Sequence, residues 1–140
     1  MRPPRRPIPA PNAETHRFWA AMERGVLELA KCQDCGRIPF PPRPRCPDCL
    51  SDSLAWVELS GRARLRGWTD NHIVDFEGYD RPVCIVECAL EEDPGAVIAM
   101  FDDAGSVRDS VPGTPLKISF ATDANGWTYP RAEVDREATR

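Results

Sequence analysis

Four of the six cysteines form two pairs, Cys32-Gln-Asp-Cys35 and Cys46-Pro-Asp-Cys49, with ten residues between the pairs. In each pair a two-residue turn can aim both sulfurs at one point about 2.3 Å away, which is the Zn–S bond length. Gly36 follows the first pair, where the chain often needs a positive φ that glycine adopts without strain. Four protein ligands leave no open position for water, so the pattern predicts a structural metal centre.

The same cysteines allow two other chemistries. Iron also binds in a tetrathiolate cage, and ligand softness alone does not separate it from Zn²⁺, the favoured metal. A redox dithiol is the third alternative, but such a pair belongs at the N-terminus of a helix that follows a strand. Prolines crowd the second pair, so no helix can follow the first; they stand at positions 41, 42, 44 and 47.

Other candidate chemistry is weaker. Cys84 and Cys88 lie about 13 Å apart along one strand, too far to bond to each other, and are predicted to be buried apolar side chains. Neither of the two histidines stands in a recognisable triad pattern, and the carboxylates of 91–93 and 102–103 fall at strand ends or turns, where charge is normally solvated. We find no glycine-rich phosphate loop, so the sequence predicts no catalytic residue.

The N-terminal part, residues 1–25, is predicted to be an arm followed by a helix. Residues 1–11 hold five prolines and three arginines, which favours extended polyproline II, either as a disordered tail or as an arm across a partner. Asn12 is a good N-cap, and Ala13–Arg24 predicts a helix that Gly25 ends. So short a helix is marginal alone and must dock, on its own ribbon or in a subunit interface. Its docking side chains are Phe18, Trp19 and Met22.

Residues 26–59 are predicted to form the metal ribbon. Val26–Lys31 leads into the first cysteine pair as a strand, and Ile38–Phe40 is expected to return beside it. Phe40–Arg45 is a rigid proline-rich bridge that presents two arginines near the second pair. Leu54–Glu58 is expected to lead out of the ribbon.

Residues 60–134 carry the pattern of an antiparallel β domain, and 135–140 a charged tail. Five strands in about 75 residues fit a small closed barrel such as the OB-fold. One strand, 82–90, is apolar on both faces apart from Glu87 and should therefore be well covered. Three arginines and Trp68 should share a face of the first barrel strand, where they could bind a polyanion or simply face solvent. The expected strands are 62–69, 82–90, 96–101, 116–120 and 127–129, and the arginines are Arg62, Arg64 and Arg66.

The composition is that of an ordinary globular protein, with 140 residues, 41% apolar and 29% charged. The net charge of −4 divides unevenly, because residues 1–50 carry nine Lys/Arg against five Asp/Glu, and 51–140 carry nine against seventeen. This balance argues weakly against general nucleic-acid binding. No apolar run approaches the roughly 20 residues of a membrane span, and the N-terminus lacks a secretory signal pattern. We therefore expect a cytoplasmic protein with reduced thiols.

Several motifs in order resemble a known family. The chain is similar, over residues 12–69, to the family called domain of unknown function 35, acyl-CoA-associated OB-fold proteins with an N-terminal zinc ribbon. The motifs are Phe18-Trp19, Gly25-x-Leu27-x-Leu29, Cys32-x-x-Cys35-Gly36, Phe40-Pro-Pro-Arg43, Cys46-Pro-x-Cys49 and Trp56-x-Glu58-x-Ser60-Gly61-Arg62. The loop 71–81 and the turn 91–95 are not typical of the family, and we expect them to set partner or substrate choice.

The resemblance implies a mainly β fold, in which an N-terminal helix and a rubredoxin-like zinc ribbon precede a five-stranded OB barrel. It also implies a small non-catalytic partner subunit in complexes with thiolases, thiolase-like aldolases of sterol side-chain breakdown, or hot-dog-fold enoyl-CoA hydratases. A nucleic-acid-binding module is the alternative from another class. The partner interface is expected at Phe18, Trp19 and Met22. A CoA thioester shared with the partner is expected to contact Phe40, Pro41, Arg43, Arg45, Arg62, Arg64 and Trp68.

Overall fold

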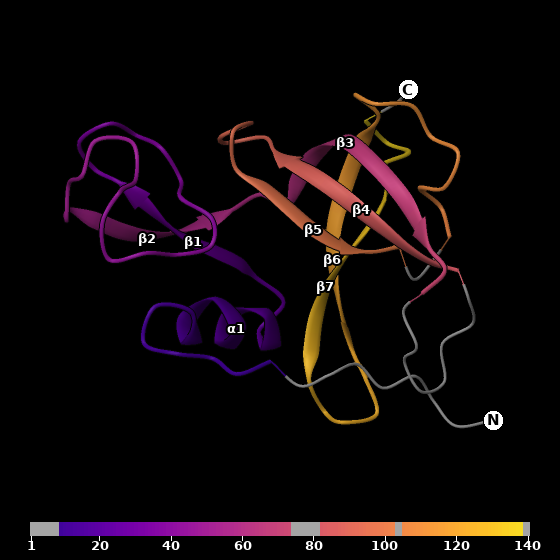
Figure 1. The fold of residues 1–140 in the computed structure, drawn as a ribbon, viewed down its shortest axis with the longest axis horizontal. Coiled ribbons are helices and arrows are strands. Elements are labelled where there is room, and N and C mark those ends of the chain that lie inside the picture. Colours follow the sequence, from indigo (N-terminus) through magenta and orange to yellow (C-terminus); the bar gives the residue numbers. More distant parts are fainter. Residues whose placement is uncertain (1–8, 74–81, 103–104, 139–140) are drawn as a thin grey trace.

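The computed structural model describes residues 9–73, 82–102 and 105–138. Helix α1 (His16–Glu23) precedes a two-stranded sheet and a closed barrel whose strand order is β3-β4-β5-β7-β6 (Figure 1). The prediction of a mainly β fold with an N-terminal helix, a cysteine ribbon and a five-stranded barrel is confirmed. The strands are β1 (Leu27–Cys32), β2 (Leu54–Leu59), β3 (Arg62–Asn71), β4 (Val83–Leu90), β5 (Val97–Phe101), β6 (Pro115–Thr122) and β7 (Thr128–Val134).

The ribbon sheet pairs β1 with β2 in antiparallel register, from Leu27 opposite Leu59 to Cys32 opposite Leu54. The predicted return strand at 38–40 is wrong, because these residues form a loop and β2 takes that place. The Ile38 N–H donates to the Asp93 carboxylate at 2.9 Å instead of to a neighbouring strand. The prolines that follow also lack the backbone donors that a strand needs.

Helix α1 is shorter than predicted at its start. The Asn12 side-chain oxygen accepts the Glu14 and Thr15 N–H groups at 3.0 Å, so it closes a turn ahead of the helix. The predicted end is confirmed: Gly25 has φ +75° and follows the last turn. The Val26 N–H then bonds to the carbonyl of Ala21 at 3.1 Å, which completes a Schellman-type cap.

The helix docks on its own chain and touches both β1 and β7 (Figure 1). Arg17 and Arg24 donate to the buried Glu28 carboxylate of β1 at 3.1 and 2.8 Å. Phe18 and Met22 are 5% and 1% exposed. The prediction that these two residues form a partner interface therefore does not fit the structure, because they are already buried inside this chain.

Aromatic side chains continue the docking into the barrel. Phe18 meets Phe40 of the ribbon at a ring-centroid distance of 5.6 Å. Trp19, which is half-buried, lies 6.0 Å from Trp127 and 6.2 Å from Tyr129, at the hairpin between β6 and β7. The helix is thus a bridge between the ribbon and the barrel.

Replacing Trp19 with alanine should weaken this bridge. Each aromatic pair contributes about 0.5–1.5 kcal/mol beyond its buried area, so the free energy of unfolding should fall by about 2 kcal/mol. Urea denaturation followed by circular dichroism measures the change. The Val111→Ala variant is the control, because Val111 is 69% exposed and contacts none of the rings in the pairs above. An equal loss of helix docking in both variants, seen in NMR spectra, would contradict the assignment.

Strand β3 contains a β-bulge that reorients its second half. Leu65 and Gly67 face consecutive residues of β4, so Arg66 is the extra residue and the inside–outside alternation shifts by one. Trp68 is then opposite Val86, whose side chain is fully buried, and packs against the core. The prediction that Trp68 shares a face with the arginines is therefore wrong.

The last barrel strand is longer than predicted. β7 runs to Val134, which lies opposite Leu116 of β6. The described part of the chain contains no helix that is long and apolar enough to cross a membrane. The arm at 1–8, most of the loop at 71–81, residue 103 and the last two residues of the predicted tail lie outside the described residues.

Candidate metal centre and ribbon–barrel joint

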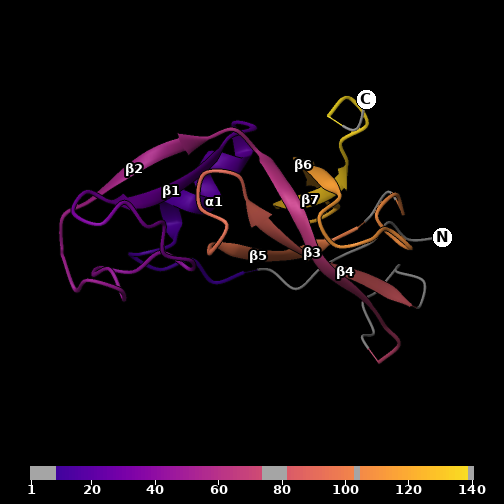
Figure 2. The same cartoon turned by 90° about the horizontal axis from the view of Figure 1, so that it is seen from above.

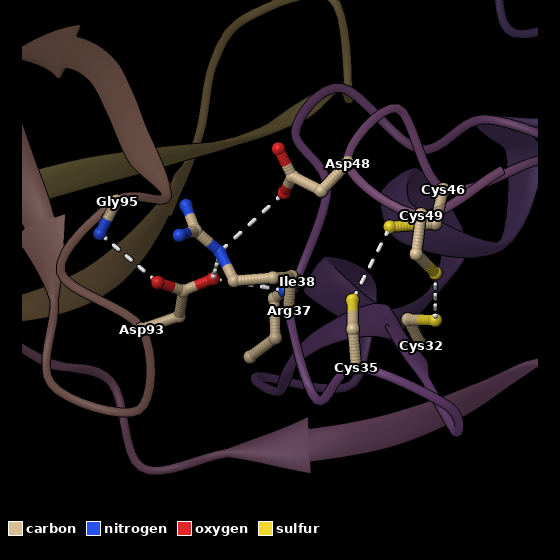
Figure 3. Close-up of polar contacts among 9 residues, drawn as sticks. All are labelled: Cys32, Cys35, Arg37, Ile38, Cys46, Asp48, Cys49, Asp93 and Gly95. Carbon is tan, nitrogen blue, oxygen red and sulfur yellow. Dashed lines mark hydrogen bonds and ion pairs between the residues drawn. The ribbon is translucent and has the colours of Figure 1, made fainter.

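The four paired cysteines converge at one point of the ribbon (Figure 3). The sulfurs of Cys32 and Cys49 are 3.5 Å apart, those of Cys35 and Cys46 are 3.6 Å apart, and all four lie within 4.8 Å of one another. A tetrahedral ion with bonds of about 2.3 Å separates its sulfur ligands by about 3.8 Å. The cage therefore fits a zinc-sized ion, and these four residues would hold it as a structural metal.

Each cysteine pair is closed by the same two backbone hydrogen bonds. In the first, the Gly36 N–H donates to the Cys32 carbonyl at 3.0 Å and the Cys32 N–H to the Arg37 carbonyl at 2.8 Å. In the second, the Leu50 N–H donates to the Cys46 carbonyl at 2.8 Å and the Cys46 N–H to the Ser51 carbonyl at 2.9 Å. The sulfur geometry is thus fixed by the backbone.

Electrostatics also favours a cation in the cage. Hydrogen bonding from the backbone of Cys35 lowers the pKa of Cys32 to about 7. The Arg37 backbone acts in the same direction on Cys35, but burial and the three neighbouring sulfurs outweigh it and raise the pKa of Cys35 to about 12. The Cys32 thiolate therefore forms readily, whereas the neighbouring sulfurs and burial raise the pKa of both Cys35 and Cys49. A divalent cation removes this opposition to ionisation.

The other two cysteines lie in the barrel, away from this centre. Cys84 and Cys88 are 4% and 0% exposed, so their predicted burial is confirmed. Burial raises the pKa of Cys84 to about 11 and that of Cys88 to about 12. Both side chains therefore stay protonated at neutral pH and pack as small apolar groups.

A second polar site, which sequence reasoning missed, joins the ribbon to the barrel. Asp93, in the turn between β4 and β5, is 8% exposed. Its carboxylate accepts the Arg37 Nε–H at 3.1 Å, the Ile38 N–H at 2.9 Å and the Gly95 N–H at 3.0 Å (Figure 3). The Arg37 Nε also lies 3.6 Å from the Asp48 carboxylate. Arg37 follows the first cysteine pair and Asp48 lies within the second, so residues beside both pairs take part in this joint.

The same turn also holds the linker between β2 and β3. The Ser60 N–H donates to Glu92 at 2.8 Å, and the Arg62 Nε–H donates to Glu91 at 2.7 Å. The hydrogen bond from Arg62 lowers the pKa of Glu91. The prediction that carboxylates of this turn are solvated is therefore wrong for Asp93, which ties the ribbon to the barrel.

The prediction of solvated carboxylates is also wrong for Asp102. It is 7% exposed, and its carboxylate accepts the N–H groups of Ser106, Val107 and Arg108 at 3.1, 2.9 and 3.3 Å. This carboxylate closes the loop between β5 and β6. Asp93 has no short-range sequence signal, because Arg37 and Ile38 lie more than fifty residues away. Asp102 instead bonds residues four to six positions further along the chain.

The residues predicted to contact CoA fall into separate groups. Arg43 and Arg45 are exposed on an open groove of about 680 Å³. The groove is lined by Asn12, Glu14, Thr15, Pro41, Pro42, Arg43, Pro44, Arg45 and Asp52. Arg64 instead reaches the Gly113 carbonyl at 3.2 Å from the outside of β3. Phe40 lies against Phe18, and Trp68 is partly buried against the barrel core. The structure therefore brings Pro41, Arg43 and Arg45 together and leaves the other predicted CoA contacts apart.

A four-cysteine ribbon followed by a closed five-stranded barrel defines the class of zinc-ribbon OB-fold proteins. A family profile described as "ChsH2, rubredoxin-like zinc ribbon domain" matches residues 19–55. Benzoylsuccinyl-CoA thiolase subunit BbsA of Thauera aromatica is 32% identical over 104 residues, which cover 64% of this chain and 71% of that protein. A DUF35 domain-containing scaffold protein of Pyrococcus furiosus is 33% identical over 93 residues, covering 64% and 66%. The chain belongs to the DUF35 family.

Solved structures share the fold. The Ltp2-ChsH2(DUF35) aldolase matches with a TM-score of 0.77 at 21% identity, over 91% of this chain and 98% of that one. A DUF35 protein of unknown function from Sulfolobus solfataricus matches with a TM-score of 0.59, also at 21% identity, over 85% and 83%. The ribbon, helix and barrel therefore form a common arrangement in these proteins.

Proposed function

We propose that this protein is a non-catalytic partner subunit of a heteromeric acyl-CoA-processing complex, and that its partner is a thiolase-fold enzyme. The observation that carries the proposal is the similarity to BbsA, which is a subunit of a thiolase. The name of the Ltp2-ChsH2(DUF35) aldolase adds a second reaction class, so the partner is a thiolase or a retro-aldolase acting on a bulky acyl chain such as a sterol or fatty side chain.

The chain's own contribution is a rigid surface. Its metal centre has four protein ligands, and its ribbon is tied to the barrel by α1 and by Asp93. Binding such a body can order the loops of an enzyme and fix its substrate, which raises turnover without any catalytic group from the scaffold. A hot-dog-fold hydratase partner is the second candidate within the same class.

Nucleic-acid binding is less well supported. Residues 51–140, which include the barrel, carry seventeen Asp/Glu against nine Lys/Arg. Strands β4 and β5 together offer one aromatic side chain, Phe101, whereas single-strand binding uses stacked aromatics on such strands. Binding to a single-stranded oligonucleotide that weakens steeply with salt would revive this alternative.

Co-expression tests the proposal. The tagged protein is produced with each thiolase-fold and hot-dog-fold subunit encoded near its gene and purified by its tag, and the stoichiometry is measured by light scattering. We expect a stable complex with a thiolase-fold subunit. A stable complex with a hydratase subunit instead, or with neither, would overturn the proposal.

We further propose that the groove beside the second cysteine pair contributes to the CoA site of the complex. Arg43 and Arg45 are its exposed cations, and Pro41 adds an apolar wall. Arginine pairs bind phosphates through charge-assisted hydrogen bonds.

The Arg43→Ala, Arg45→Ala double variant should therefore weaken CoA binding by the complex about tenfold, a loss of about 1.4 kcal/mol. Isothermal titration calorimetry measures it. The Lys31→Ala, Arg136→Ala double variant is the control, because both cationic side chains are exposed and neither lines the groove. If both variants and the wild type bind CoA with equal affinity, the groove does not contact CoA, but the proposed scaffold role still stands.

A further inference from the structure

The cysteine cage is open to solvent on one side. Its four sulfur-bearing residues divide by exposure, because Cys32 and Cys46 are 0% exposed, whereas Cys35 and Cys49 are exposed. The stretches of chain around the two exposed cysteines, 33–37 and 47–50, are also exposed throughout. A small solute can therefore reach one cysteine of each pair.

Each exposed cysteine lies beside a buried cysteine of the other pair. The sulfur of Cys49 is 3.5 Å from that of Cys32, and the sulfur of Cys35 is 3.6 Å from that of Cys46 (Figure 3). A disulfide joins its sulfurs at about 2 Å, so each sulfur would have to move by about 0.8 Å. Cysteines that respond to oxidants are typically accessible and have a second cysteine beside them. The cage contains two such couples.

The joint between the ribbon and the barrel begins two residues after Cys35. The Arg37 N–H hydrogen-bonds to the Cys35 sulfur, and the Arg37 carbonyl accepts the Cys32 N–H at 2.8 Å. The Arg37 side chain and the Ile38 N–H both donate to the Asp93 carboxylate, at 3.1 and 2.9 Å. Figure 2 shows the turn between β4 and β5, which holds Asp93, reaching from the barrel toward the ribbon. One residue, Arg37, thus connects the cage to the joint.

We propose that the cage is a redox switch, in which a hydroperoxide oxidises the thiolates, the metal leaves and the ribbon loosens on the barrel. The inference concerns this chain alone and does not depend on the proposed partner subunit. The switch differs from a catalytic dithiol, because the bound metal holds the four thiolates until an oxidant consumes them.

The oxidation is a two-electron step for each couple. The Cys49 thiolate attacks one oxygen of hydrogen peroxide, the O–O bond breaks, and the displaced hydroxide takes a proton from solvent to form water. The Cys32 thiolate then attacks the sulfenic sulfur. The S–S bond forms, and the S–O bond breaks to release a second hydroxide, which also becomes water. The two thiolates lose two electrons, and the peroxide gains them. A second peroxide joins Cys35 to Cys46 in the same way.

Oxidation should release the metal and disturb the joint. After the first bridge two thiolates remain, too few for the four-ligand set of a structural zinc site, so the ion leaves. The bridge at Cys35 moves the sulfur that accepts the Arg37 N–H and replaces a charged acceptor by a neutral one, which makes a weaker hydrogen bond. Arg37 is then free to shift, and its bonds to Asp93 weaken because hydrogen bonds depend steeply on geometry.

Peroxide treatment of the zinc-loaded full-length protein tests the switch. A chromogenic chelator reports released zinc, peptide mapping after alkylation identifies the bridges, and residual dipolar couplings report the orientation of the ribbon relative to the barrel. We expect release of a full equivalent of zinc, bridges Cys32–Cys49 and Cys35–Cys46, and altered couplings between ribbon and barrel. Dithiothreitol with added zinc should restore the original couplings, because thiols reduce accessible disulfides by exchange.

Two double variants separate the cage from the other thiols. The Cys84→Ala, Cys88→Ala variant is the control and should release zinc at the wild-type rate, because both thiols are buried in the barrel. The Cys35→His, Cys49→His variant keeps a Cys2His2 ligand set but lacks both exposed thiolates. Its zinc should be released about tenfold more slowly, since access controls the reactivity of a thiolate. If this variant binds no zinc, the bridges mapped in the wild type still decide the test.

Three results would overturn the switch. The first is wild-type protein that keeps its zinc under conditions that oxidise the thiols of the metal-free protein. The second is zinc release without bridges, or with bridges between other cysteines. The third is a bridged protein with unchanged dipolar couplings, because oxidation would then change the metal content and not the joint. The proposed function is tested separately, by co-expression.

Discussion

The Cys46→Ser variant should lose tight metal binding and the ordered ribbon while the barrel stays folded. Cys46 is fully buried, and its loss removes one of four thiolates from a closed cage. A structural zinc site of this kind contributes about 10–16 kcal/mol to folding of its own unit. The ribbon is too small to replace that contribution with a hydrophobic core, whereas the barrel has buried residues on all five strands.

Three measurements follow this prediction. Mass spectrometry of metals should find a full equivalent of zinc in the wild type and little in the variant. NMR amide signals of residues 27–59 should collapse, while those of the barrel strands persist. The Cys88→Ala variant is the control, because it removes a buried thiol outside the cage and should keep its metal.

Chelation of the wild type should then release the partner subunit before the barrel unfolds. Simultaneous loss of partner and barrel would show that the ribbon and the barrel fold as one cooperative unit. Full zinc content in Cys46→Ser would show that another group can complete the cage. If the bound metal is iron instead of zinc, the identity of the metal changes, but the ribbon still depends on the metal for its folding and the barrel does not.

The features predicted well from the sequence depend on residues close together in the chain. The two-residue spacing within each cysteine pair is enough to point both sulfurs toward one metal position. Gly25, with its positive φ, ends α1, and the N–H groups of Gly25 and Val26 bond to carbonyls of the last helical turn. Alternation of apolar and polar residues gave the arginine face of β3 up to Arg66. In each case the determining contacts lie within about one turn or one strand.

The features that were missed depend on distant contacts or on a local irregularity. Arg37 and Asp93 are 56 residues apart, so nothing near either residue indicates their hydrogen bond. The bulge at Arg66 inserts one residue, which turns Trp68 inward although its spacing from Arg64 suggests the opposite. The groove at Arg43 likewise forms only because residues 12–15 fold back beside the prolines.

Asp93→Ala should lower the free energy of unfolding by about 3 kcal/mol and loosen the ribbon against the barrel. The variant removes hydrogen bonds to a charged acceptor, which contribute about 1.5–3 kcal/mol each. It leaves the Ile38 N–H without its acceptor in a buried position, and it frees Arg37. Urea denaturation measures the stability, and residual dipolar couplings measure the orientation of the ribbon relative to the barrel.

Two further variants separate the bonds that meet at Asp93. A methyl group at Gly95 would lie 2.1 Å from the Arg37 guanidinium, so Gly95→Ala should displace that flexible side chain and leave the Ile38 bond in place. Its effect should therefore be well below that of Asp93→Ala. Asp48→Asn, at an exposed pair 3.6 Å from Arg37, should change stability by less than about 1 kcal/mol. If Asp93→Ala leaves the dipolar couplings unchanged, helix α1 and the contacts of the β2–β3 linker with Glu91 and Glu92 are sufficient to hold the ribbon.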